Sequence, residues 1–465
     1  MVAFPDLPPL EPHSPVPLYR QLYAFIRDAI KLGSLRTGDR IPPTREMAHL
    51  AGVNRATVAA AYELLESDGL IQGLVGRGSF VLQPPVARAP LTPTVISFAT
   101  SRPSADLFPL TEFRQTVQEV LDSAHLTSLL QLGSPSGFPP LKAALLPPSS
   151  AEILITNGCQ QALDLIARTM AAPGDTVLVE DPVYGGLKNA FASARVRLAG
   201  LPDLHRNPEA SVALIERERP RLVVVTPDFQ NPTGLTLSAD TRRALGLATA
   251  RAGVPLVEID LYRDLRYSGV SIPTIQELVP EAQVLLLRSF SKIAFPGLRV
   301  GWISGPRPLL ARLTETKQWT DLHTDQFSQA VLLRFLESKR LEKHRQRVVQ
   351  SGAACLKAAL EACQRELPRG SEFTRPVGGM NLWVTLPGPI DSAAMLTRAQ
   401  REGVTYLPGS YFAVERPQTS SLRLSFAGLP PGAIREGIAM LGRVATAELS
   451  RSRAQQYEPA AMAMV

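Results

Sequence analysis

The stretch Ser289-Phe290-Ser291-Lys292-Ile293-Ala294-Phe295-Pro296-Gly297-Leu298-Arg299-Val300-Gly301 decides how most of this sequence is interpreted. The apolar run 284–287 precedes it and predicts a buried strand that ends at two serines and a lone lysine. A lysine just past a buried strand suits Schiff-base chemistry, because desolvation lowers its pKa and frees the amine. Two serines and an arginine beside it suit a phosphate. The stretch therefore indicates pyridoxal phosphate, although a lysine without such neighbours usually lies on a solvated loop.

The pattern S-F-S-K-x-x-x-P-G-L-R-x-G in this stretch resembles the cofactor-lysine motif of fold-type I aminotransferases. The resemblance implies that Lys292 forms the internal aldimine with pyridoxal phosphate and acts as a catalytic residue. It also implies that Ser289, Ser291 and Arg299 hold the cofactor phosphate.

Outside this stretch, strand-like and helix-like runs alternate from about residue 152 onward. The candidate strands are residues 153–156, 176–179, 222–226, 255–259, 284–287 and 300–304. This alternation indicates an α/β domain with a largely parallel sheet. Such sheets place ligands at the carboxyl ends of their strands, and the residues that carry chemistry in this sequence fall there.

Two turns that follow candidate strands carry residues suited to a phosphorylated aromatic ligand. Gly158 opens a predicted helix, where backbone amides can approach an anion. Tyr184 can stack on an aromatic ring, although a core or interface tyrosine is an equal alternative. By resemblance to fold-type I enzymes, Gly158, Cys159 and Gln160 cradle the phosphate and Tyr184 stacks on the cofactor.

Two further strand ends carry Asn231, within Asn-Pro-Thr-Gly, and the pair Asp260 and Tyr262. A carboxylate beside a pyridine nitrogen keeps the nitrogen protonated and makes the ring an electron sink. By the resemblance, Asp260 takes this catalytic role, while Asn231 and Tyr262 contact the phenolate oxygen. A turn without function is the alternative for Asn231.

Arg423 lies in the apolar run 422–426, where a charge is costly unless it meets an anion. By the resemblance, Arg423 binds the substrate α-carboxylate bidentately, with Asn231 beside it. An internal ion pair is the alternative.

The first eighty residues show a different pattern. Residues 18–32 have helical spacing, and a turn then leads to Thr44, the predicted N-cap of a short helix over 45–50. Asn54 is expected to cap a second helix that runs to about residue 68. Two short helices joined by a glycine-containing turn form a helix-turn-helix signature, and residues 70–82 predict a two-stranded wing. A helical protein-interaction module is the alternative.

Residues 15–82 resemble the GntR-family winged helix. The matching segments are P-L-Y-R-Q-L, G-D-R-I-P-P-T-R-E-M-A, N-R-A-T-V-x-x-A-Y and G-R-G-S-F-V. By this match Arg45 and Arg55 contact phosphates or bases of a double-stranded DNA operator. Asn54 and Thr57 belong to the same surface, and Arg77 lies in the wing.

Composition sets limits on these interpretations. The net charge of +7 permits nucleic-acid binding, but residues 1–83 carry eight basic and eight acidic side chains. DNA binding by this region therefore depends on where its basic side chains lie, not on its total charge. Three widely spaced cysteines and six unclustered histidines predict no metal site and fit a reduced cytoplasm. No run of eighteen apolar residues and no signal-peptide pattern is present, so we expect no membrane partner.

Together these patterns predict an α+β winged helix-turn-helix domain over residues 1–82 and a proline-rich linker over 83–95. An α/β fold-type I, pyridoxal-phosphate-dependent aminotransferase-like domain is predicted over 96–450, and a tail over 451–465. The combination resembles the MocR subfamily of GntR regulators. It implies a cytoplasmic homodimer that binds DNA and responds to an amino acid or amine by aldimine exchange at Lys292. Two alternatives remain: an active amino-acid aminotransferase with a secondary DNA-binding domain, and a vitamin B6 sensor.

Two positions depart from the fold-type I pattern. Leu132 stands where the family usually has a tyrosine that reaches the phosphate across the dimer. The segment 141–150 is several residues short, which predicts a truncated helix. Both departures predict slow turnover.

Overall fold

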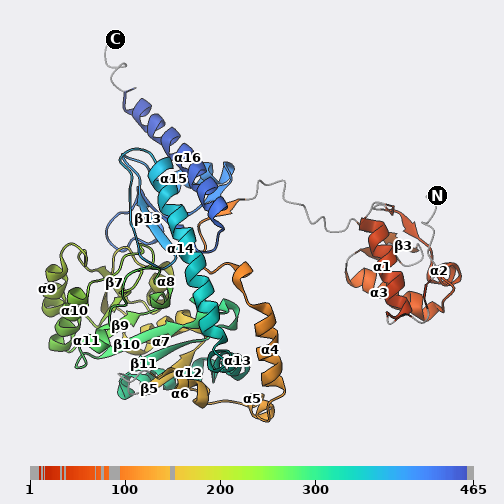
Figure 1. Cartoon of the computed structure of the whole chain (residues 1–465), viewed down its shortest axis with the longest axis horizontal. Helices are drawn as coiled ribbons and strands as arrows, with labels where there is room; N and C mark the ends of the chain where they lie inside the picture. The colour runs from red at the N-terminus through yellow and green to blue at the C-terminus, as the bar shows by residue number, and fades with distance from the viewer. Residues whose placement is uncertain are drawn as a thin grey trace. The chain divides into compact units, whose positions relative to one another are not determined.

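The computed structural model describes residues 10–457, except 12–13, 15, 32–33, 36–37, 69, 75–77, 83–94 and 147–151. The chain divides into two compact units, Met1–Thr94 and Val95–Val465 (Figure 1). All but residue 95 of the linker predicted over 83–95 lies outside the described residues, as does Arg77 of the wing.

The N-terminal unit combines three helices with a three-stranded antiparallel sheet within its described residues. The helices are α1 (Leu18–Lys31), α2 (Thr44–Leu50) and α3 (Arg55–Ser67), and the strands, in sheet order, are β1 (Arg40–Ile41), β3 (Gly78–Val81) and β2 (Ile71–Leu74). The apolar faces of the helices meet in one core that includes Leu22, Ile26, Val58 and Leu65. This arrangement is the predicted winged helix, with one strand more than the sequence pattern indicated.

Two details of the N-terminal prediction are wrong. Thr44 is the first residue of α2 rather than its N-cap, because Pro43 occupies the cap position and no side chain caps the helix. β1 lies in a segment predicted only as a turn, since a two-residue strand is too short to show alternation.

The C-terminal unit is built on a seven-stranded sheet among its described residues, in the order β5-β11-β10-β9-β8-β6-β7. The strands are β5 (Glu152–Thr156), β6 (Thr176–Val179), β7 (Arg197–Gly200), β8 (Leu222–Val225), β9 (Leu256–Ile259), β10 (Val284–Ser289) and β11 (Gly301–Gly305). β11 runs antiparallel to β10 and β5, and the other pairs are parallel. The largely parallel sheet was predicted. β7 was missed because this edge strand is only partly buried and has no apolar run.

Helices cover both faces of this sheet (Figure 1), so successive residues of its central strands are all buried. One face packs against α7 (Gly158–Met170), α8 (Gly185–Ser193) and α12 (Arg307–Asp321). The other packs against α9 (Pro208–Glu218), α10 (Ala239–Ala252), α11 (Ile275–Leu278), α13 (Gln326–Glu337) and α14 (Arg340–Glu366). The helices that precede this sheet in the chain are α4 (Leu110–Leu121), α5 (Leu126–Leu129) and α6 (Pro139–Leu145).

A smaller layer follows along the chain. Its antiparallel sheet has the order β12-β13-β16-β15, formed by β12 (Glu372–Phe373), β13 (Asn381–Thr385), β15 (Leu407–Pro408) and β16 (Ser421–Ser425). β4 (Ile96–Ser97) pairs in parallel with β14 (Val404–Thr405). The helices of this layer are α15 (Ser392–Arg401) and α16 (Pro431–Tyr457), and α16 packs against α14. Short 3-10 turns lie at η1 (Ala105–Leu107), η2 (Arg263–Leu265), η3 (Phe290–Lys292), η4 (Pro296–Leu298) and η5 (Gly409–Tyr411). Among the described residues, no helix is both long and apolar enough to cross a membrane.

Candidate functional site

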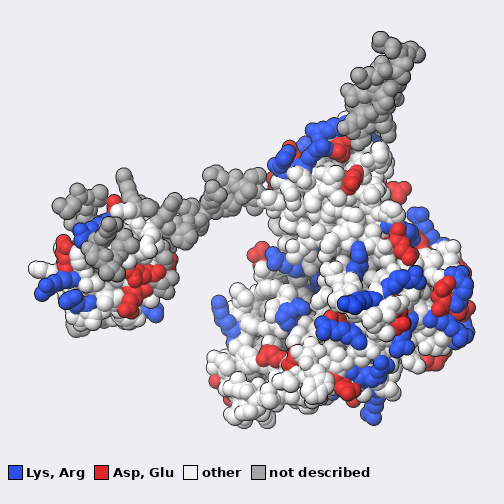
Figure 2. Space-filling view, turned by 180° about the vertical axis from the view of Figure 1, so that it is seen from behind, with Lys and Arg blue, Asp and Glu red and all other residues white. Residues whose placement is uncertain are grey.

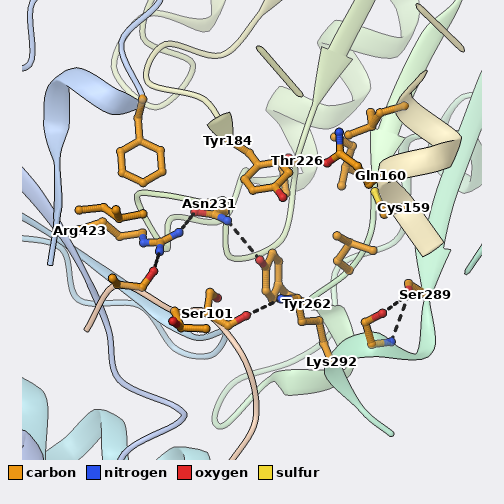
Figure 3. Close-up of a pocket in the computed structure, with 18 of the residues that line it drawn as sticks. Ser101, Cys159, Gln160, Tyr184, Thr226, Asn231, Tyr262, Ser289, Lys292 and Arg423 are labelled. Carbon is orange, nitrogen blue, oxygen red and sulfur yellow. Dashed lines mark hydrogen bonds between the residues drawn. The ribbon is translucent and has the colours of Figure 1, made fainter. Parts of the chain in front are cut away.

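A cavity of about 360 Å³ opens at the carboxyl ends of the central strands (Figure 3). The residues predicted from the sequence that line it are Cys159, Gln160, Tyr184, Asn231, Tyr262, Ser289, Ser291, Lys292, Arg299 and Arg423. Gly158 and Asp260 adjoin lining residues along the chain without lining the cavity themselves. Residues from widely separated parts of the sequence therefore converge at one place.

Lys292 ends the 3-10 turn η3, directly after β10. Its Nζ donates a hydrogen bond to the Ser101 carbonyl oxygen at 2.6 Å and lies 5.6 Å from the centroid of the Tyr262 ring (Figure 3). The turn is fixed by Phe290, which is buried and packs 5.1 Å from the Trp302 ring. The amine is thus held inside the cavity by a main-chain acceptor and a ring face, without a carboxylate partner among the described residues.

Beside the lysine, hydroxyl groups and a guanidinium gather at the start of α7. Ser289 Oγ donates to Val300 O at 3.0 Å and accepts the Ser291 backbone N–H at 3.1 Å. Arg299 Nη2 donates to Asn157 O at 3.3 Å. Gly158 has φ +75°, a backbone conformation that favours glycine, and a Cβ there would lie 2.5 Å from the Arg299 guanidinium and displace it. Free amides of a helix start, two hydroxyls and an arginine together suit a phosphate dianion.

Behind this cradle lies a polar cluster that the sequence analysis missed. Asp321 Oδ2, at the end of α12, accepts hydrogen bonds from Asn157 Nδ2 at 2.8 Å and Gln161 Nε2 at 2.6 Å. Asp321 Oδ1 pairs at 2.7 Å with Lys317, which is fully buried and whose pKa is lowered by that burial. Gln161 Oε1 accepts the Asn157 backbone N–H at 2.7 Å. The cluster fixes the turn before Gly158. In the sequence, Lys317 and Asp321 look like an ordinary solvated helix pair.

Asp260 follows β9 and is buried, and neither carboxylate oxygen has a hydrogen-bond partner among the described residues. Oδ2 lies 3.1 Å from Arg288 Nε, close enough for an ion pair but without the geometry of a hydrogen bond. Burial raises the pKa of this carboxyl group to about 6, and Arg288 opposes the rise. A buried carboxylate without a donor is costly, so its position suits a ligand that brings an N–H, such as a pyridinium.

Arg423 is buried in β16 and belongs to a chain of polar contacts across the cavity (Figure 3). Its Nη1 donates to Asn231 Oδ1 at 3.0 Å, its Nη2 donates to the Ala99 carbonyl oxygen, and its Nε has no partner among the described residues. Asn231 Nδ2 donates to the Tyr262 hydroxyl at 3.4 Å. The ion pairs of the described chain include none to Arg423, so the alternative of an internal ion pair is wrong. A buried arginine without a carboxylate suits an anionic ligand.

In the N-terminal unit, some of the predicted DNA-contacting residues stabilise a helix and others are exposed to solvent. Asn54 caps α3, since its Oδ1 accepts the Thr57 backbone N–H at 2.8 Å and the Thr57 hydroxyl at 2.9 Å. Arg45 on α2 and Arg55 at the start of α3 are exposed. On the face seen in Figure 2, basic side chains of this unit lie mainly to one side and a group of acidic ones to the other.

The two departures from the family pattern have structural counterparts. The Leu132 side chain is 79% exposed, so it makes little contact within its own chain. α6 ends at Leu145 after seven residues.

Comparison with known proteins agrees with this geometry. Residues 94–441 match the family of aminotransferases of class I and II, and residues 18–81 match the bacterial regulatory proteins of the gntR family. The chain is 35% identical over 376 residues to aromatic-amino-acid aminotransferase 1 of Thermococcus litoralis, covering 77% of this chain and 90% of that protein.

Two regulators match over almost the whole length. The chain is 31% identical to the uncharacterized HTH-type regulator YdfD of Bacillus subtilis, covering 92% of this chain and 96% of that protein. It is 28% identical to the probable rhizopine catabolism regulatory protein MocR of Rhizobium meliloti, covering 92% and 94%.

A solved structure supports the cofactor. LysN, the α-aminoadipate aminotransferase of Thermus thermophilus complexed with N-(5'-phosphopyridoxyl)-L-leucine, aligns with a TM-score of 0.72 and 33% identity, over 77% of this chain and 93% of that one. The larger domain is therefore a fold-type I domain that takes pyridoxal phosphate. The chain joins this domain to a GntR winged helix, and it belongs to the MocR subfamily of GntR-family regulators.

Proposed function

We propose that this regulator changes its affinity for a DNA operator when an amino acid or amine reacts with the pyridoxal phosphate held at Lys292. The observation that carries the proposal is the set of buried polar atoms on Asp260 and Arg423 that make no hydrogen bond within the described chain, in one protein with a winged helix. A domain kept only as a scaffold would have no need to retain such costly groups.

The residues of the cavity divide the work between cofactor and effector. Bound pyridoxal phosphate supplies an aldehyde that reacts with amines and a ring that accepts electrons. The cradle of Gly158, Cys159, Gln160, Ser289, Ser291 and Arg299 holds the phosphate. Asp260 would accept a hydrogen bond from the protonated ring nitrogen and keep it protonated. Tyr184 would cover the ring, and Asn231 and Tyr262 would donate to its phenolate oxygen.

Arg423 would then bind the effector carboxylate. Its free Nε and its Nη2 lie on the same edge of the guanidinium and offer a bidentate fork, and only one of the two Nη2 N–H groups donates to the Ala99 carbonyl oxygen. Burial lowers the pKa of Arg423 and strengthens its attraction to an anion. Lys292 Nζ, when not joined to the cofactor, lies 5.6 Å from the centroid of the Tyr262 ring. If the protein has two arrangements that differ in affinity for both the effector and the operator, effector binding must change operator affinity.

We further propose a homodimer that acts in the cytoplasm, where bacterial DNA lies. Four large apolar side chains are exposed at the segment after α5 and the end of α12: Leu130, Leu132, Trp319 and Leu322, with exposed fractions of 72%, 79%, 82% and 56%. Gln326 Nε2, at the start of α13 and four residues after Leu322, donates to Gln131 O at 2.8 Å, which ties the segment after α5 to the chain that follows α12. A second copy that covers this patch would explain its apolar character.

The experiment measures operator affinity with and without each amino acid that shifts the absorbance of bound cofactor. We expect at least one to change operator affinity a few-fold. Arg423→Ala should lose this response while it still binds operator, and Arg375→Ala, an exposed arginine of the same layer, should keep it. Operator affinity that no such amino acid changes would reject the regulatory proposal.

The alternative is an active aminotransferase, favoured by the convergence of Lys292, Asp260 and Arg423 on one cavity. It predicts rapid conversion of an amino acid to its 2-oxo acid in the same samples, with operator affinity unchanged. A vitamin B6 sensor would instead respond to removal of pyridoxal phosphate and to no amino acid.

A further inference from the structure

Asp260 faces an arginine that the proposed function does not use. β9 and β10 pair in parallel with Leu287 opposite Ile259, so the next residues, Arg288 and Asp260, are also neighbours. β10 and β11 pair antiparallel with Arg288 opposite Trp302. Side chains opposite one another on adjacent strands share a face of the sheet. Asp260, Arg288 and Trp302 therefore form one row across three strands.

The guanidinium of Arg288 is fixed from three sides. Its Nε lies 3.1 Å from Asp260 Oδ2, and its Nη2 donates to Asp264 Oδ2 at 3.0 Å. Its central carbon lies 5.7 Å from the centroid of the Trp302 ring. An arginine held between two carboxylates and an indole has little freedom to move away from Asp260.

Other charged groups around Asp260 come from three elements. Arg263 and Asp264 belong to η2, Asp228 follows β8, and Glu258 lies two residues earlier. Among these groups Arg288 has the largest effect in favour of the Asp260 anion, and burial is the largest effect against it. Among the charged neighbours of this buried carboxyl group, Arg288 therefore contributes most to its ionised form.

We propose that Arg288 is a positioning residue that shares the Asp260 carboxylate with the ring nitrogen of bound pyridoxal phosphate. Arg288 engages Oδ2 and leaves Oδ1 for the ring nitrogen. A carboxylate already neutralised by a guanidinium attracts the ring proton less strongly. The site is thereby adjusted toward holding an amine rather than toward fast proton transfer at the amine's α-carbon. The inference rests on the proposed role of Asp260.

The test compares two ligands on the full-length protein after the cofactor has been removed. One ligand is pyridoxal phosphate, and the other is its analogue with carbon in place of the ring nitrogen. The ratio of their dissociation constants isolates the contact at the ring nitrogen, because the phosphate cradle and Lys292 treat both alike. Arg288→Gln should raise the preference for pyridoxal phosphate about tenfold, the effect of one pKa unit on Asp260. Arg288→Lys, which keeps the charge, should stay within about twofold of the parent by the same relation.

Each outcome has a meaning. A proportional loss of affinity for both ligands in Arg288→Gln, with the ratio unchanged, would show a purely structural role and overturn the proposal. If Arg288→Gln binds neither ligand, the proposal is tested by Arg288→Lys. A tenfold rise in the ratio of dissociation constants for Arg288→Lys would show that the positive charge is not responsible, and would overturn the proposal. Asp260→Asn should bring the ratio close to one, and a parent protein without any preference would reject the role of Asp260 as well. Operator affinity is measured separately, so failure of the regulatory proposal remains distinguishable.

Discussion

The proposed DNA-contacting surface and the cofactor site use arginine in opposite ways. Arg45 and Arg55 are exposed, and each belongs to a short helix that is continuous in sequence. Arg423 is buried and Arg288 is half-buried, and each has a polar partner that lies on another element of the fold. Exposed charges interact weakly through water, whereas buried charges are costly without partners and strong with them. Substitutions should therefore have large, specific effects at the cofactor site and small, cumulative effects in the winged helix.

The largest effect should come from Lys292→Ala. Its amine is the only one that lines the described cavity, so the variant should lose the absorbance of covalently bound cofactor completely. The phosphate cradle is untouched, and some pyridoxal phosphate should still bind without the covalent link. Spectra of the parent and variant with added cofactor check this, and an unchanged spectrum would contradict the assignment of Lys292.

Next in size is Asp321→Ala. Removing this carboxylate leaves Lys317 buried without its ion-pair partner, which should lower the free energy of unfolding by about 3 kcal/mol. Asn157 and Gln161 lose their acceptor as well, so cofactor affinity should fall with stability. Denaturant unfolding and cofactor titration measure the two effects.

Asp164→Ala on α7 is the matched control for this variant, since Asp164 pairs with the more exposed Arg168. Its cost should be about 0.5 kcal/mol. Equal effects of the two substitutions would break the contrast between buried and exposed charges.

A pH effect of roughly 3 kcal/mol should come from Asp260 in the cofactor-free protein. Its pKa is raised from 3.8 to about 6 by burial, so the folded state binds a proton that the unfolded state releases between these values. The contribution of Asp260 to the free energy of unfolding is therefore full below about pH 4 and is lost as the pH rises through 6. Asp260→Asn removes this component, so the difference between parent and variant isolates it. A difference that does not change between pH 4 and 7 would contradict the burial argument.

The smallest effects belong to the winged helix. Arg55→Ala should cost roughly 1–3 kcal/mol of operator binding if Arg55 contacts a base. Arg45→Ala should weaken binding to all sequences alike and lower the salt dependence by about one unit, as a lost phosphate contact does. Arg206→Ala, an exposed arginine of the larger domain, is the control and should change neither. Full operator affinity in both variants would show that this surface does not contact DNA.

The sequence predicts the parts of the site that one local motif contains, and it misses the contacts between residues far apart in the chain. Lys292, Ser289, Ser291 and Arg299 stand within eleven residues, so a local motif was enough to place them together. The contact between Arg423 and Asn231 joins residues 192 positions apart, and the pairing of Arg288 with Asp260 depends on strand register. No local sequence pattern contains both partners of either contact, so neither contact could be predicted. Asp321 was missed for the same reason, because the side chains it supports lie 160 or more positions away.

One feature of the site bears on how this protein can diverge. The acceptor of Lys292 Nζ is the main-chain carbonyl of Ser101, and Arg423 Nη2 donates to that of Ala99. Replacing a side chain does not remove a carbonyl oxygen. Ala99, Thr100 and Ser101 are also among the residues that line the cavity. Mutations in this segment can therefore reshape the space offered to the effector while the anchors of the lysine and the arginine persist, which leaves descendants free to acquire new signals.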